Sequence, residues 1–158
     1  MIYIFDLDLT IWESFDKYNN QIWAKQLVPP FEVYDDIITD DVFSKCILKE
    51  GIRDYLKYLK RTGADLGYIS VAKYTGIPLE IQPSVLALKA FDLYDHFTFC
   101  KVLEYKTFDK SIFLKNITEN ITFYDDSDEH LNSVKNIKNI EAIDAKKIND
   151  WREFIKNG

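Results

Sequence analysis

The chain opens with MIYIFDLDLTIW, in which two aspartates, Asp6 and Asp8, directly follow an apolar run. A buried strand ordinarily ends in a turn with few polar side chains, so two carboxylates and Thr10 at this point require a chemical explanation. A carboxylate can attack phosphorus as a nucleophile, and a second carboxylate nearby can protonate a leaving group and later activate water. The stretch therefore indicates acid–base and nucleophilic chemistry rather than a simple turn.

A second acidic group follows a later apolar run in FYDDSDEHL, where Asp125 and Asp126 come directly after residues 121–124. Ser70 ends another apolar run, and Lys110 stands at the start of an amphipathic segment. Clustered carboxylates need a cation to stay ionised, and hard oxygen ligands suit Mg²⁺. A lysine and hydroxyl groups can hold phosphoryl oxygens as their charge shifts in the transition state. Together these groups fit phosphoryl transfer.

The elements that position these groups alternate along the chain. Strands are expected at 1–5, 64–70, 96–102, 121–124 and 139–145. Helices are expected at 51–63, near 84–92, from about Asp109 or Lys110, over the segment with Leu131, Val134 and Ile137, and at 146–158. Such alternation implies an α/β fold with a doubly wound, Rossmann-like parallel sheet of about five strands. Ligands of these sheets bind at the carboxyl ends of the strands, where the polar groups would meet.

Residues 11–50 stand apart from this alternation. Pro29 and Pro30 interrupt the chain, and the segment VYDDIITDDVFSKCIL (33–48) is typical of two short strands around an acidic turn at 39–41. We expect a small hairpin insert and no large cap domain, so that residues 1–158 form a single domain.

Composition limits the classes of function. The 158 residues are 47% apolar and 15% aromatic, which predicts a folded globular protein. A net charge of -6 disfavours a nucleic-acid partner and means that local cations must attract an anionic substrate. Cys46 and Cys100 lack the number and spacing of a disulfide framework or a zinc site. With no signal-peptide pattern and no membrane-spanning run, we expect a cytoplasmic protein without a membrane partner.

The motif DLDLT (6–10) after an apolar strand resembles the first motif of the haloacid dehalogenase superfamily. Ser70, Lys110 and FYDDSDEHL (123–131) resemble its second, third and fourth motifs. FDLDLTIW, the prolines of PPFE and the short hairpin together resemble most the magnesium-dependent phosphatase family within it. That family is known for acting on phosphotyrosine and small sugar phosphates, so the resemblance implies a phosphatase on a Rossmann-like sheet.

The resemblance also implies a role for each position. Asp6 is the nucleophile and a metal ligand, and Asp8 is the acid–base catalyst whose carbonyl oxygen also binds the metal. Asp126 completes the protein ligands of Mg²⁺ and Asp125 is accessory, although the doublet leaves this choice open. The residues expected to contact the phosphoryl group are Leu7, Thr10, Ser70 and Lys110. Lys106 rivals Lys110, which is preferred because it stands at the start of a helix.

The leading hypothesis is a Mg²⁺-dependent phosphatase that hydrolyses a phosphate monoester through an aspartyl-phosphate. A response-regulator-like phospho-acceptor domain uses similar groups, but it phosphorylates an aspartate at the end of a third strand, where this chain has Lys101 and Val102. A dehalogenase or phosphonatase on the same fold is disfavoured by Asp8, because those reactions use no acid–base aspartate there. The substrate stays open between a small phosphorylated metabolite and a phosphorylated protein side chain, and the oligomeric state is open as well.

Overall fold

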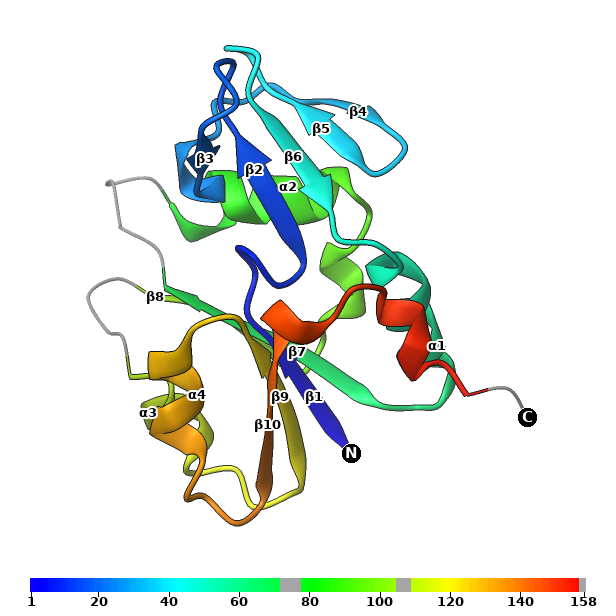
Figure 1. Ribbon diagram of the computed structural model, residues 1–158, viewed down its shortest axis with the longest axis vertical. Coiled ribbons are helices and arrows are strands. Elements are labelled where there is room, and N and C mark those ends of the chain that lie inside the picture. Colours follow the sequence, from blue (N-terminus) through cyan, green and yellow to red (C-terminus); the bar gives the residue numbers. More distant parts are fainter. Residues whose placement is uncertain (72–77, 105–108, 157–158) are drawn as a thin grey trace.

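Two sheets make up the protein (Figure 1). The structure is a computed structural model that describes residues 1–71, 78–104 and 109–156. A five-stranded parallel sheet forms one half, and a five-stranded antiparallel sheet lies beyond one end of its strands. The α/β class and the five parallel strands predicted from the alternation are confirmed.

The parallel sheet has the strand order β10-β9-β1-β7-β8, and every neighbouring pair is parallel. Its strands are β1 (Ile2–Phe5), β7 (Asp65–Val71), β8 (Cys100–Glu104), β9 (Ile121–Asp125) and β10 (Ile140–Asp144). The central strand β1 is level with both neighbours, because Phe5 pairs with Tyr68 of β7 and with Tyr124 of β9. The polar residues that follow these three strands therefore emerge at one edge of the sheet.

Apolar side chains cover both faces of the parallel sheet, because successive residues of a strand point to opposite sides. Ile4 joins a cluster with Leu114 and Val134 on one face, and Phe5 joins a larger aromatic cluster on the other. In Figure 1, α3 (Ser111–Leu114) and α4 (Asp128–Val134) lie beside the first face of the parallel sheet, and α1 (Ile52–Arg61) lies towards the second. Helix α2 (Pro83–Ala90) lies against the antiparallel sheet instead.

Helix α1 forms where the sequence predicts it. Its buried residues recur on one face, at Ile52, Tyr55, Leu56 and Leu59. Gly51 precedes the helix with φ of 77°, and a Cβ at this position would collide with the Asp150 side chain. Glycine is therefore required here both for the left-handed backbone and for the close approach of the C-terminal segment.

The expected hairpin insert is wrong in extent. Residues 12–48 form an antiparallel sheet of order β3-β2-β6-β5-β4. Its strands are β2 (Trp12–Phe15), β3 (Gln21–Ile22), β4 (Glu32–Tyr34), β5 (Ile37–Thr39) and β6 (Lys45–Leu48), and the turn η1 (Ala24–Gln26) follows β3. The predicted hairpin corresponds to β5 and β6. The other strands read WESF, QI and EVY, and none of them is an apolar run that would mark a strand in the sequence.

The C-terminal segment also differs from expectation. In place of a closing helix over 146–158, the described residues form two short 3₁₀ turns, η4 (Ala145–Lys147) and η5 (Trp151–Phe154). The Asp150 carboxylate accepts a 2.9 Å hydrogen bond from the backbone N–H of Arg152, which competes with a continuous helix. Trp151 is then buried among the aromatic side chains of the larger core cluster.

Smaller boundaries shift as well. The strand expected at 96–102 begins only at Cys100, because the turn η3 (Tyr94–His96) precedes it. In α3, the inward residue is Leu114, while Ile112 is 49% exposed. In the described part of the chain, no helix has the length and apolar character needed to cross a membrane.

Candidate active site

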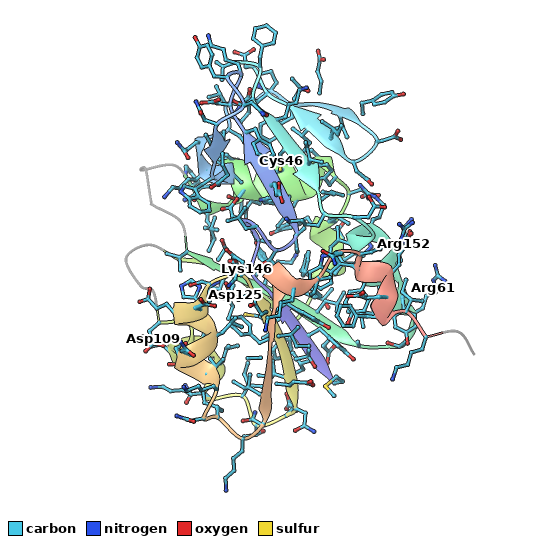
Figure 2. All side chains as sticks on the ribbon, viewed as in Figure 1. Cys46, Arg61, Asp109, Asp125, Lys146 and Arg152 are labelled. Carbon is cyan, nitrogen blue, oxygen red and sulfur yellow. The ribbon has the colours of Figure 1, made fainter. Side chains whose placement is uncertain are left out.

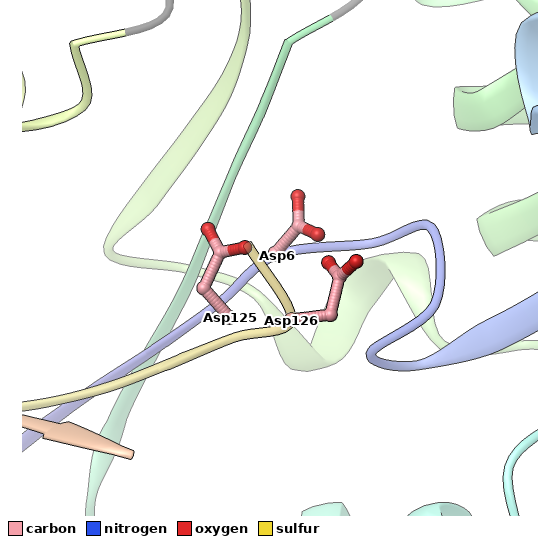
Figure 3. A group of neighbouring side chains, drawn as sticks. All are labelled: Asp6, Asp125 and Asp126. Carbon is pink, nitrogen blue, oxygen red and sulfur yellow. The ribbon is translucent and has the colours of Figure 1, made fainter. Parts of the chain in front are cut away.

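Three carboxylates meet at the carboxyl edge of the parallel sheet (Figure 3). Figure 2 shows one of them, Asp125, at the end of this sheet that lies towards the second sheet. Asp6 directly follows β1, Asp125 ends β9, and Asp126 comes next in the chain. The backbone N–H of Asp6 donates a 2.9 Å hydrogen bond to the carbonyl of Tyr124, which holds the two strand ends together. One oxygen from each carboxylate lies within 4.8 Å of the others. The sequence-predicted acidic groups of strands β1 and β9 are thus brought together.

Lys110 lies between two of these carboxylates. Its Nζ donates hydrogen bonds of 2.8 Å to Asp6 Oδ1 and 2.6 Å to Asp125 Oδ2, and the side chain is fully buried. Burial lowers the pKa of Lys110, but the two carboxylates outweigh it and raise that pKa above the usual value. Lys110 stands at the start of α3, as expected. Its rival Lys106 lies outside the described residues.

Asp125 has a donor on each oxygen. Its Oδ1 accepts a 3.0 Å hydrogen bond from the backbone N–H of Ser127, and its Oδ2 lies 3.1 Å from Nδ1 of His130 and also accepts from Lys110. Although burial opposes ionisation, these partners lower the pKa of Asp125. Asp125 is therefore held in the cluster by contacts to Ser127, His130 and Lys110. His130 belongs to the site too, and the sequence offered only its place in the turn after the acidic doublet as a signal.

Asp6 and Asp126 lie next to each other in this group (Figure 3). Burial, together with the neighbouring carboxylates Asp125 and Asp126, raises the pKa of Asp6 well above its ordinary value, although Lys110 opposes the shift. Among the described residues, three carboxylates are matched by a single buried ammonium. Such a donor set, with hard oxygens and excess negative charge, fits a divalent cation such as Mg²⁺.

Asp8 is turned towards the second sheet. It is half-buried, and its Oδ1 accepts hydrogen bonds from Nε1 of Trp12 at 3.0 Å and from the backbone N–H of Ala24 at 2.9 Å. Burial raises the pKa of Asp8, although both donors oppose that change. The Asp126 carboxylate adds to the rise in the pKa of Asp8, but Asp8 is not one of the three grouped carboxylates. A carboxyl whose pKa is raised is suited to hold and release a proton.

A tight loop after β1 carries both Asp6 and Asp8. Leu9 has φ of 62°, an uncommon backbone conformation for a residue with a side chain. The carbonyl of Leu7 accepts from the backbone N–H groups of Thr10 and Ile11 at 3.1 and 2.8 Å, which closes the loop. Local strain of this kind persists where the surrounding structure enforces it.

The other residues predicted to contact the phosphoryl group differ in how their side chains are placed. The Leu7 side chain is fully buried in the core, so its contribution is limited to its backbone. Thr10 is buried and its Oγ1 donates a long 3.5 Å hydrogen bond to Asp6 Oδ2. Ser70 is buried near the carboxyl end of β7, the strand beside β1, and therefore lies at the edge where the sequence predicts it.

Comparison with known proteins adds no family assignment. No protein-family model matches the chain, and no curated protein matches it. The function must therefore be argued from the site itself.

Proposed function

We propose that this chain is a Mg²⁺-dependent phosphatase of the haloacid dehalogenase type, most like the magnesium-dependent phosphatase family. The observation that carries the proposal is the Lys110 ammonium held between Asp6 and Asp125, with the Asp126 carboxylate beside them. A nucleophilic carboxylate, a cation for phosphoryl oxygens and further carboxylates for a metal ion thus share one small site.

In the first step, a carboxylate oxygen of Asp6 attacks the phosphorus of a phosphate monoester. The new bond from oxygen to phosphorus forms as the bond from phosphorus to the leaving oxygen breaks, and Asp8 gives its proton to that leaving oxygen. Lys110 and Ser70 hold the phosphoryl oxygens during the transfer. The product is an aspartyl-phosphate at Asp6 and a free alcohol.

In the second step, a water molecule attacks the phosphorus of the aspartyl-phosphate. Asp8, now ionised, takes the proton of that water, while the bond from phosphorus to the Asp6 oxygen breaks. Inorganic phosphate leaves, and both aspartates return to their starting states. The hydrogen bonds from Trp12 and Ala24 keep Asp8 oriented through both steps.

Asp6 and Asp126 would hold the Mg²⁺, with Asp125 close enough to take part. When bound, the ion supplies positive charge that offsets the negative charge of the carboxylates and the phosphoryl oxygens. Lys146 supports this region, because its Nζ donates a 2.7 Å hydrogen bond to the backbone carbonyl of Asp126.

A panel of phosphorylated metabolites and phosphotyrosine peptides, assayed with Mg²⁺, tests the proposal. We expect repeated turnover of at least one phosphate monoester by the wild-type protein and none by Asp6→Asn. A domain that only accepts a phosphoryl group would instead take up one equivalent and stop. Absence of any hydrolysis, with p-nitrophenyl phosphate included in the panel, would overturn the phosphatase assignment.

A further inference from the structure

His130 is a side chain of the site to which the proposed reaction assigns no role. Its ring nitrogen Nδ1 lies 3.1 Å from Oδ2 of Asp125, and 12% of its side chain is exposed. The same oxygen accepts the 2.6 Å hydrogen bond from Nζ of Lys110. Because a carboxylate oxygen accepts hydrogen bonds and has no proton to donate, Nδ1 is the donor in this contact. His130 and Lys110 thus meet on one oxygen of Asp125.

The start of α4 fixes the place of His130. The backbone N–H of His130 donates a 3.4 Å hydrogen bond to Oγ of Ser127, the N-cap residue, and the carbonyl of His130 accepts a 2.7 Å hydrogen bond from Oγ of Ser133. The backbone N–H of Ser127 donates to Oδ1 of Asp125. The turn that begins α4 therefore holds the Asp125 carboxylate at both oxygens, at Oδ1 through Ser127 and at Oδ2 through His130.

Asp125 becomes more important to Lys110 once the proposed reaction has begun. In the resting site, the Lys110 ammonium is bound to two carboxylates, Asp6 and Asp125. When an oxygen of Asp6 forms the bond to phosphorus, the Asp6 carboxyl group loses its negative charge. Of these two partners, Asp125 then remains as the anion that holds Lys110. The orientation of the Asp125 carboxylate therefore fixes the ammonium while it binds the phosphoryl oxygens.

From these contacts we infer that His130 is a positioning residue, which holds the Asp125 carboxylate so that Lys110 stays directed at the transferred phosphoryl group. The inference rests on the proposed phosphatase function and adds a residue to its site. Within the described ranges, none of the hydrogen bonds of His130 reaches Asp6 or Asp126. Loss of the His130 ring should therefore affect phosphoryl binding rather than Mg²⁺ binding.

Two variants of the same shape test this role. The amide nitrogen of asparagine stands as many bonds from Cα as Nδ1 of histidine does, so His130→Asn keeps a donor for Asp125, whereas His130→Leu has none. On the monoester that the wild type hydrolyses best, we expect His130→Leu to lower kcat by about tenfold or more, as is typical when the partner of a site residue is removed. It should also weaken inhibition by inorganic phosphate severalfold and leave the affinity for Mg²⁺ unchanged. His130→Asn should restore both kcat and phosphate inhibition to near the wild-type values.

Asn132→Leu is the control, because Asn132 is an exposed residue of the same helix, and it should change neither quantity. If His130→Leu does not fold, His130→Gln takes its place, since its amide nitrogen stands further from Cα and should not restore the contact with Asp125. No loss in His130→Leu, equal losses in the leucine and asparagine variants, or an equal loss of Mg²⁺ affinity contradicts the positioning role, while hydrolysis by the wild type still supports the proposed function. Failure of the wild type to hydrolyse any monoester contradicts the proposed function, and the inference with it.

Discussion

The indole Nε1 of Trp12 donates a 3.0 Å hydrogen bond to Oδ1 of Asp8. Trp12 begins β2 of the second sheet, and it also forms an isolated β-bridge with Asp8. The proposed acid–base catalyst is therefore fixed by the second sheet, whereas the proposed nucleophile Asp6 is fixed by the parallel sheet through its bond to Tyr124. The two catalytic carboxylates thus depend on the two sheets keeping their relative positions.

We expect Trp12→Phe to lower kcat on alkyl phosphates by about tenfold, because the phenyl ring occupies the buried space but donates no hydrogen bond to Asp8. Trp151→Phe is the matched control, since Trp151 is also buried but packs against Tyr124 in the aromatic core. Steady-state kinetics and thermal unfolding of both variants separate the effects. Both should lose stability and only Trp12→Phe should lose turnover; equal losses of kcat would contradict a positioning role.

Asp6→Asn should abolish turnover and yet stabilise the metal-free fold. Burial raises the pKa of Asp6 well above its ordinary value, so the ionised carboxylate disfavours the folded state when no cation is bound. The asparagine oxygen can still accept from Lys110. In EDTA near neutral pH, we expect the melting temperature of the variant to exceed that of the wild type. The rise should be about 2–4 °C for each kcal/mol by which the free energy of unfolding increases.

The same shift predicts a pH dependence in EDTA. A group with a raised folded-state pKa makes the fold more stable as the pH falls through that pKa, because the folded state then binds the additional proton. The stability advantage of Asp6→Asn should therefore shrink as the pH is lowered. Asp41→Asn, a change at an exposed aspartate of the second sheet, should show neither effect. If the metal-free Asp6→Asn variant melts below the wild type, the ionised Asp6 carboxylate does not destabilise the folded state.

Lys110→Met should destabilise the protein by about 3–5 kcal/mol, because it leaves the buried carboxylates of Asp6 and Asp125 without their counter-charge. Lys115→Met, an exposed change at the end of the same helix, should change the free energy of unfolding in urea only a little.

For activity, Lys110→Ala should lower kcat far more than Lys106→Ala. The reverse order of damage would transfer the phosphoryl-binding role to Lys106.

Chelation should abolish turnover, and added Mg²⁺ should restore it. Asp126→Asn is expected to weaken Mg²⁺ binding at least about tenfold with little loss of stability. Asp125→Asn should instead reduce stability, because Lys110 and His130 lose their shared anionic partner. Calorimetric Mg²⁺ titration and thermal unfolding of both variants decide between them. Full activity after exhaustive chelation would contradict a metal-dependent reaction.

The acidic site could be predicted from the sequence because the apolar runs IYIF and ITFY mark two strands, one followed directly by Asp6 and the other ending at Asp125. Parallel strands bring such ends to one edge, so their sequence separation does not matter. The second sheet could not be predicted in full, because a strand as short as Gln21–Ile22 cannot show the alternation of apolar and polar residues that marks a strand. His130 was missed for a different reason: its ring returns to Asp125 only because Ser127 turns the chain into α4.

The role of Asp8 as an acid can be tested through the leaving group. A sugar alkoxide is a poor leaving group and needs a proton in the transition state, whereas a nitrophenolate barely does. Asp8→Asn should therefore slow phosphorylation of Asp6 severely with an alkyl phosphate and much less with p-nitrophenyl phosphate.

The second step gives this variant a distinctive signature. Attack by water needs Asp8 as a base, so with the aryl substrate the phospho-enzyme should accumulate at Asp6. Rapid mixing should then show a burst of nitrophenol close to one equivalent of enzyme, followed by a very slow steady state. The hydrogen bonds from Trp12 and Ala24 can still be accepted by the asparagine oxygen, so the loop keeps its shape and the comparison isolates the proton. Equal slowing of the first step for both substrates, without a burst, would mean that Asp8 serves only to tie the loop to the second sheet.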